Sequence, residues 1–119
     1  MSELRADTIT ASDGTSPVTL TKQSAAKCFQ KFTMAGANEE SFNASTLTDS
    51  GSGDFSINFT NNMNTTTYTV NSNVYSSADR TANCDQHTTS QVGIATWYNL
   101  SRSEDSIGAA SGMVHGDLA

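Results

Sequence analysis

Residues 46–60 read TLTDSGSGDFSINFT, and the glycine-rich centre of this stretch decides the fold. The segment SGSGD suits four structures: a flexible linker, a phosphate-binding loop, an acidic calcium loop and the tip of a β-hairpin. After it, Phe55, Ile57 and Phe59 alternate strictly with polar residues. An apolar period of two is typical of a strand with one buried and one solvated face. The residues after the glycines are therefore predicted to form a strand.

The flanks of the glycines favour a hairpin over the other three structures. The β-prone Thr-Leu-Thr ends just before Asp49, and the alternating segment begins one residue after Asp54. A phosphate loop would run into a helix, and a calcium loop needs more oxygen ligands than two carboxylates supply. At a hairpin tip, glycine accepts positive φ and aspartate favours the turn and solvent.

The rest of the chain predicts an all-β fold. Further strands are expected at residues 28–34, 42–47, 67–75, 92–100 and 107–118. Ser, Thr and Asn make up 44 of the 119 residues. Asn and Ser are weak helix formers, and Thr fits a pleated sheet. About six to eight short strands with almost no helix indicate a small antiparallel β-sandwich or jelly-roll-like module.

The predicted loops lie between these strands. Residues 35–41, 76–90 and 101–106 are polar and show no apolar period. Residues 76–90 and 101–106 are expected to face outward, where loops on a rigid sheet usually carry recognition.

The chain is expected to have two parts, an N-terminal arm at residues 1–26 and a β-sandwich module at residues 27–119. The arm contains few apolar side chains, too few to form a core of its own. It must pack on the module or on another subunit. The apolar residues assigned to this assembly arm are Leu4, Ile9, Val18 and Leu20.

The composition excludes some partners. The formal net charge is −6, and no two of the six Lys and Arg residues are adjacent. A nucleic-acid groove and an anionic membrane surface both require clustered cations. No stretch approaches the length of a membrane span, and the start MSELRADTIT is not a secretory signal. We expect no nucleic-acid binding, no membrane insertion and synthesis in a cytoplasm.

The sequence predicts neither a catalytic nor a metal site, and no cofactor. Cys84 and His87 form one C-x-x-H pair, which is half of a zinc site. Serine is abundant, but no G-x-S-x-G elbow is present. Cys28 and Cys84 are expected to be free thiols, and spacing alone leaves a disulfide between them open.

Three aromatic residues are candidates for surface recognition. Trp97 and Tyr98 are adjacent, so a strand would point one inward and the other outward. The commoner arrangement is a core tryptophan with a surface tyrosine, whereas an outward aromatic ring can stack on a sugar or a protein partner. Tyr75, at a strand end, is the third candidate.

Small residues fill the final predicted strand, IGAASGMVHGDL at residues 107–118. They indicate close approach of another backbone, either at a symmetry axis or in a tightly packed sheet.

Several stretches resemble virion structural proteins of marine tailed bacteriophages, cyanophages included. SELRADTITASDGTSPVTLTKQSAAK at residues 2–27 is similar to the opening of such proteins. ESFNASTLTDSGSGDFSINFTNNMNTTTYTV at residues 40–70 resembles the strand, D-x-G-x-G-D, strand, F-T-x-x-M, Tyr pattern of phage tail-fibre modules, and the closing MVHGDLA also fits. The resemblance implies a non-enzymatic appendage, often a homotrimer, and it carries no catalytic residues.

The resulting expectation is a virion protein, assembled in the cytoplasm of a bacterial host. It would be a tail-fibre-like appendage that mediates assembly, host-surface recognition or both. Its expected partners are itself, as a homotrimer, other tail or capsid proteins, and a host surface glycan. One alternative is a capsid decoration protein with the same architecture. A carbohydrate-binding module and a small hydrolase are alternatives from other classes.

Overall fold

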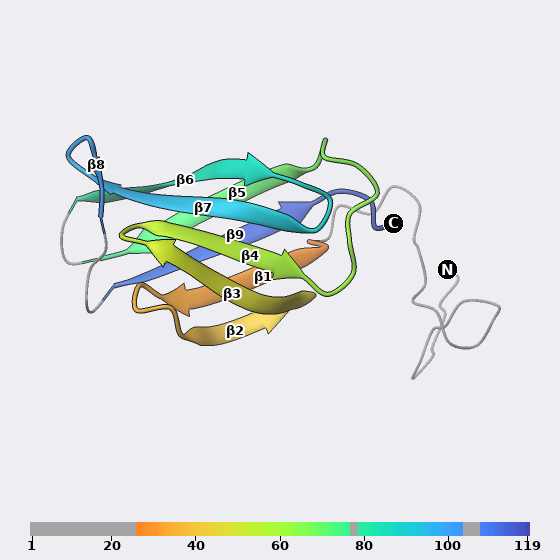
Figure 1. Cartoon of the computed structure of the whole chain (residues 1–119), viewed down its shortest axis with the longest axis horizontal. Coiled ribbons are helices and arrows are strands. Elements are labelled where there is room, and N and C mark those ends of the chain that lie inside the picture. The colour runs from red at the N-terminus through yellow and green to blue at the C-terminus, as the bar shows by residue number, and fades with distance from the viewer. Residues whose placement is uncertain (1–25, 77–78, 104–107) are drawn as a thin grey trace, which may run out of the picture.

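The computed structural model describes residues 26–76, 79–103 and 108–119, apart from the side chain of Gln86. The described residues form two antiparallel sheets (Figure 1). One sheet has the order β2 (Asn38–Phe42), β1 (Cys28–Thr33), β9 (Ala109–His115) and β5 (Thr69–Tyr75). The other has the order β3 (Ala44–Gly51), β4 (Asp54–Phe59), β7 (Gln91–Tyr98) and β6 (Arg80–His87), with β8 (Ser101–Arg102) paired to β7. The predicted all-β class is confirmed for this part of the chain.

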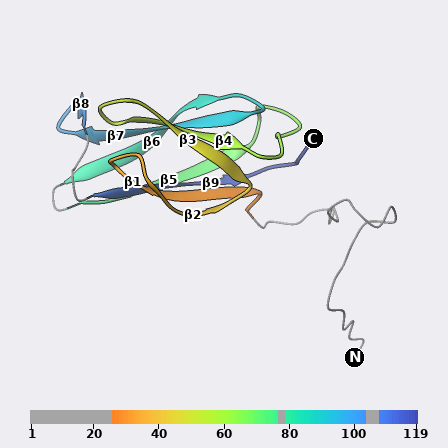
Figure 2. The same ribbon diagram turned by 60° about the horizontal axis from the view of Figure 1, so that its bottom comes forward.

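The two sheets lie face to face as layers (Figure 2) and enclose one core. Alternate residues of the strands point into it, as the period of two predicts for one-sided burial. The rings of Phe32 on β1 and Phe55 on β4 meet across the layers, with centroids 4.9 Å apart. The fully buried side chains include Cys28, Phe32, Phe55, Ile57, Val92, Ile94 and Val114. The architecture is therefore a β-sandwich.

The glycine-rich stretch is the β3–β4 hairpin tip, as predicted. Gly51 pairs with Asp54 across the turn, and Gly51 and Gly53 have φ values of 134° and 70°. The Asp49 carboxylate accepts the Gly51 N–H at 3.1 Å. Gly53 is buried, and a Cβ there would lie 2.6 Å from Ser103 N and from Thr96 O. The tip is thus packed against the β7–β8 region at Gly53, whereas Gly51 and Ser52 are exposed.

Three predicted loops contain strands. Residues 35–41 include most of β2, whose residues are all exposed, so this edge strand carries no apolar period. Residues 76–90 were expected to be a loop, but residues 80–87 form β6. Among its described residues, the apolar side chains that pack on the core are the small Ala82 and Cys84. Residues 101–106 begin with the two-residue β8, and residues 104–107 lie outside the described part.

Close sheet packing explains the small residues of β9. A Cβ on Gly112 would lie 2.8 Å from Ile57 Cδ1 and 3.0 Å from Ile94 Cδ1 on the facing sheet. Of the two predicted causes, a tightly packed sheet accounts for this glycine within one chain.

Both ends of the described sandwich lie at the same end of the molecule (Figure 1). Lys27 N–H donates to Val114 O at 2.7 Å as the chain enters β1. Leu118 forms a bridge with Met63 shortly after the chain leaves β9. The β7–β8 turn lies at the opposite end. The predicted arm, with Leu4, Ile9, Val18 and Leu20, lies outside the described residues apart from its last residue, Ala26.

Candidate functional site

A groove of about 720 Å³ lies on the outer face of the five-stranded sheet, where β6 pairs with β7. The register places Thr81 opposite Trp97 and Asn83 opposite Ala95. The groove lies beside the β7–β8 turn, at the end of the molecule opposite the described chain ends. Its lining residues are Asp79, Thr81, Asn83, Trp97, Asn99 and Leu100.

Trp97 points out of the core, in contrast to the commoner arrangement expected from the sequence. Val92 and Ile94 on β7 belong to the core, so Trp97, an odd number of residues away, has the opposite orientation. Its side chain is partly buried in the outer surface. The prediction that one of the two adjacent aromatics faces outward holds, and Trp97 is the outward one.

An arginine between two carboxylates holds the indole in place. The Arg102 guanidinium lies 5.6 Å from the centroid of the Trp97 ring, within range of a cation–π contact. Arg102 also forms ion pairs with Asp54, at 2.8 Å, and with Asp85. These partners come from β4 and β6, so the charge of Arg102 is balanced where it stacks on the ring.

The turn between β7 and β8 forms one wall of the groove in a strained conformation. Asn99 and Leu100 have φ values of 53° and 86°, as in a two-residue type I′ hairpin loop. That loop favours Asn-Gly, because glycine alone has no Cβ penalty at positive φ. Leu100 instead occupies the second position and is 100% exposed.

The Trp97 indole also carries an unpaired donor. Its Nε1 is buried and has no hydrogen-bond partner among the described residues. A buried donor without an acceptor costs about 1–3 kcal/mol. The groove thus contains two unfavourable features, the unpaired Trp97 donor and the strained backbone of Leu100.

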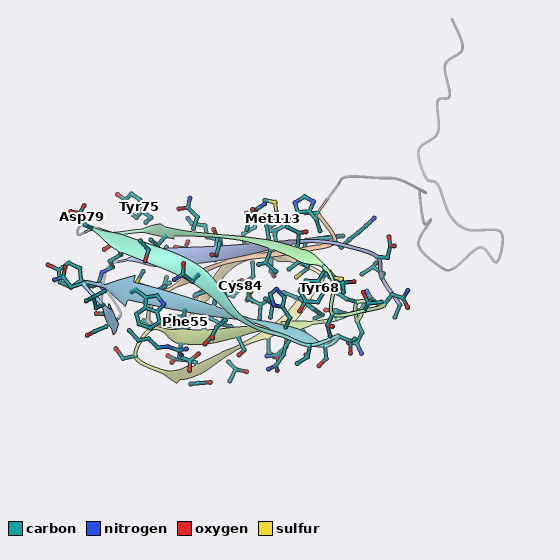
Figure 3. The ribbon with its side chains drawn as sticks, turned by 90° about the horizontal axis from the view of Figure 1, so that it is seen from above. Phe55, Tyr68, Tyr75, Asp79, Cys84 and Met113 are labelled. Atoms are coloured by element: carbon teal, nitrogen blue, oxygen red, sulfur yellow. The ribbon has the colours of Figure 1, made fainter. Side chains whose placement is uncertain are left out.

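The other two predicted recognition residues lie outside the groove. Tyr98 is 40% exposed, and the Arg80 guanidinium lies 5.2 Å from its ring centroid. Tyr75 is 77% exposed at the end of β5, in the opposite sheet. Figure 3 shows Tyr75 and Asp79 toward one end of the molecule, away from Tyr68. The structure therefore gathers only Trp97 of the three into the groove.

Sequence reasoning missed an exposed apolar row on the four-stranded sheet. The register aligns Phe42 of β2, Phe29 of β1 and Met113 of β9 side by side. The two phenylalanine rings stack with centroids 6.2 Å apart, and Phe42 and Met113 are 56% and 42% exposed. Asn43, at φ 55°, separates β2 from β3. The row was missed because residues 42–47 were predicted to form one continuous strand, whereas Phe42 ends β2 and Ala44 begins β3.

The side chains of Cys84 and His87 meet near the C-terminal end of β6. The Cys84 Sγ lies 3.2 Å from His87 Nε2, and the imidazole lies against Tyr68, with ring centroids 5.0 Å apart. Burial raises the pKa of Cys84, and it raises the pKa of Tyr68 to about 12. Cys28 and Cys84 are both free thiols.

The pair has no further metal-binding neighbours in the part of the chain that the structure describes. There, no three His, Cys, Asp or Glu side chains gather as a set that could hold a metal ion. Within the same residues, no helix is long and apolar enough to cross a membrane.

Comparison with known proteins identifies no relative. No family model, no curated protein and no solved structure matches this chain.

Proposed function

We propose that this chain is a non-enzymatic structural module of a phage-type virion appendage, which attaches at one end and recognises a surface at the other. The observation that carries the proposal is that the two ends of the sandwich differ. The described chain ends lie together at one end, and the groove with its exposed turn lies at the other. A rigid β-sandwich that separates attachment from recognition suits an appendage.

The virion assignment rests on the resemblance of residues 2–27 and 40–70 to phage structural proteins. In this proposal residues 1–26 form the attachment arm, and the partners are other virion proteins.

Self-association would use the row of Phe42, Phe29 and Met113. Exposed apolar rows of this kind mark interaction sites. Lys31, next to the row, pairs with Glu39 at 2.7 Å, and Glu40 is also exposed. The Lys31–Glu39 pair neutralises part of the charge beside the row, so other copies of the chain can approach it. We propose a homotrimer, and light scattering of the full chain should give three times the mass of one chain. A monomer would contradict this part of the proposal.

The test of the proposed function is incorporation into particles. The full chain should co-purify with virions on a density gradient, and a variant lacking residues 2–21 should fold but remain in the soluble fraction. A full chain that never bands with particles would contradict the virion assignment. A truncated chain that incorporates normally would contradict the role of the arm.

Copy number separates an appendage from a capsid decoration protein. Densitometry of purified virions should give on the order of tens of copies or fewer for a tail appendage, since cyclic symmetry limits the copies at one vertex. Hundreds of copies would instead identify a decoration protein.

A further inference from the structure

We propose that the groove beside Trp97 is a binding site for a neutral carbohydrate. The inference rests on the proposed function, because it names the ligand class of the end that the appendage presents. Its test uses the isolated chain, so a failure here is distinct from a failure to join particles.

The groove combines one aromatic ring with a set of short polar side chains. Trp97 supplies a flat apolar surface, and Leu100 extends it at the turn. Thr81 of β6 lies opposite Trp97 in the register, and Asn83, Asp79 and Asn99 also line the groove. A sugar has the matching chemistry, since its C–H face packs on an aromatic ring while its hydroxyls bond to amides, hydroxyls and carboxylates.

The charges around the groove favour an uncharged ligand. Asp79 is the ionisable residue of the lining, and the whole chain carries a net charge of −6. Arg102, which stacks on Trp97, is already paired with Asp54 and Asp85. A uronic or sialic acid would therefore meet the Asp79 carboxylate, and no lysine or arginine is among the described residues that line the groove. A neutral hexose has no such penalty.

The unfavourable features of the groove are a second, independent observation. Leu100 has a φ of 86° and is fully exposed, where glycine would be relaxed. The buried Trp97 Nε1 has no partner among the described residues. Strain and unpaired donors persist mainly where a function retains them. Here both occur at residues that line the same hollow.

The experiment is a glycan array followed by titration of the intrinsic fluorescence. Trp97 is the single tryptophan of the chain, so its emission reports on this groove alone. The full-length chain should bind one or more neutral glycans on an array that also displays acidic ones. In solution, a bound glycan should reduce the quenching of Trp97 by acrylamide, because the sugar covers the ring.

Variants then assign the binding to the groove. Trp97→Ala should weaken binding about tenfold or more, as expected for a central aromatic contact. Asn83→Ala should weaken it less and leaves the tryptophan reporter in place. Tyr75→Ala is the matched control, an exposed aromatic in the other sheet, and should bind normally. Thermal unfolding of each variant identifies any that fail to fold.

Several results would overturn the proposal. They are an array without a neutral hit, binding of acidic glycans alone, unchanged quenching of Trp97 on saturation, and normal binding by folded Asn83→Ala. Equal loss of binding in Tyr75→Ala would also move the site away from the groove.

Discussion

At the scale of single residues, the turn between β7 and β8 combines a favourable and an unfavourable residue. Asn99 suits positive φ, whereas Leu100 at φ 86° does not. A residue with a Cβ costs about 1–2 kcal/mol in this region. Glycine avoids that cost, but the greater conformational entropy of its unfolded state offsets about 0.5–1 kcal/mol of the gain. Leu100→Gly should therefore raise the free energy of unfolding by roughly 0.5–1 kcal/mol. Urea unfolding measures this, and a destabilised variant would contradict the strain.

The two glycines of the β3–β4 tip differ in what surrounds them. A Cβ on Gly53 would lie 2.6 Å from two backbone atoms, whereas a Cβ on Gly51 would meet nothing within 4 Å. Gly53→Ala combines backbone strain with overpacking, so it should destabilise the fold by about 2–4 kcal/mol. Gly51→Ala, the matched control, should show only the smaller loss from its φ of 134°. Equal losses in thermal unfolding would mean that the tip does not pack on β7–β8.

At the scale of elements, the contact between the sheets depends on Gly112 of β9. A Cβ there would lie 2.8 Å from Ile57 Cδ1, so Gly112→Ala should destabilise the sandwich by about 1–3 kcal/mol. Ile57→Val removes that methyl group. The double variant should lose less stability than the sum of the two single losses, because the closest of the contacts with the added Cβ is gone. Additive losses in a double-mutant cycle would show that the sheets do not meet at this point.

Sequence patterns predicted the strands that bury one face against the core. Phe55, Ile57 and Phe59 made β4 recognisable, because large apolar side chains recur at every second position. The strand β6 was missed because its inward residues are small, and β2 was missed because an edge strand with both faces exposed has no apolar period. An apolar period of two arises because one face of a strand is buried, so it identifies a strand only where such a face exists.

The groove was only partly predictable for a related reason. The pair Trp97-Tyr98 lies at the end of the strand that borders the groove, but adjacency alone does not say which ring faces out. Tertiary pairing decides that, since the register sets Trp97 opposite Thr81 on the outer face. Leu100 gave no turn signal, because a leucine replaces the glycine that normally reveals a type I′ loop.

At the scale of the whole molecule, the ionisation of the buried Cys28 thiol and Tyr68 hydroxyl makes the free energy of unfolding depend on pH in the alkaline range. Burial raises the pKa of Cys28 from 9.0 to about 11 and that of Tyr68 from 10.0 to about 12. The folded chain therefore retains protons that the unfolded chain releases. Their contribution to stability is complete below about pH 9 and is lost as the pH rises toward 12.

The urea midpoint should accordingly fall between about pH 9 and pH 11, where the unfolded chain loses the Cys28 proton first. Cys28→Ala removes one of the buried titrating groups and should make this fall shallower. A midpoint that stays constant up to pH 11 would show that Cys28 is not held as a buried thiol.

The proposed orientation of the molecule has attachment at the end where the described chain enters and leaves, and recognition at the β7–β8 turn. Immunogold electron microscopy of intact particles tests it with two tagged full-length chains. One carries an epitope in the Asn99–Leu100 turn, an exposed tip that should accept an insertion. The other carries it directly after Met1. The proposed orientation predicts labelling of the turn epitope on intact particles and labelling of the N-terminal epitope only after disruption. The reverse pattern, or particles that carry neither epitope, would contradict it.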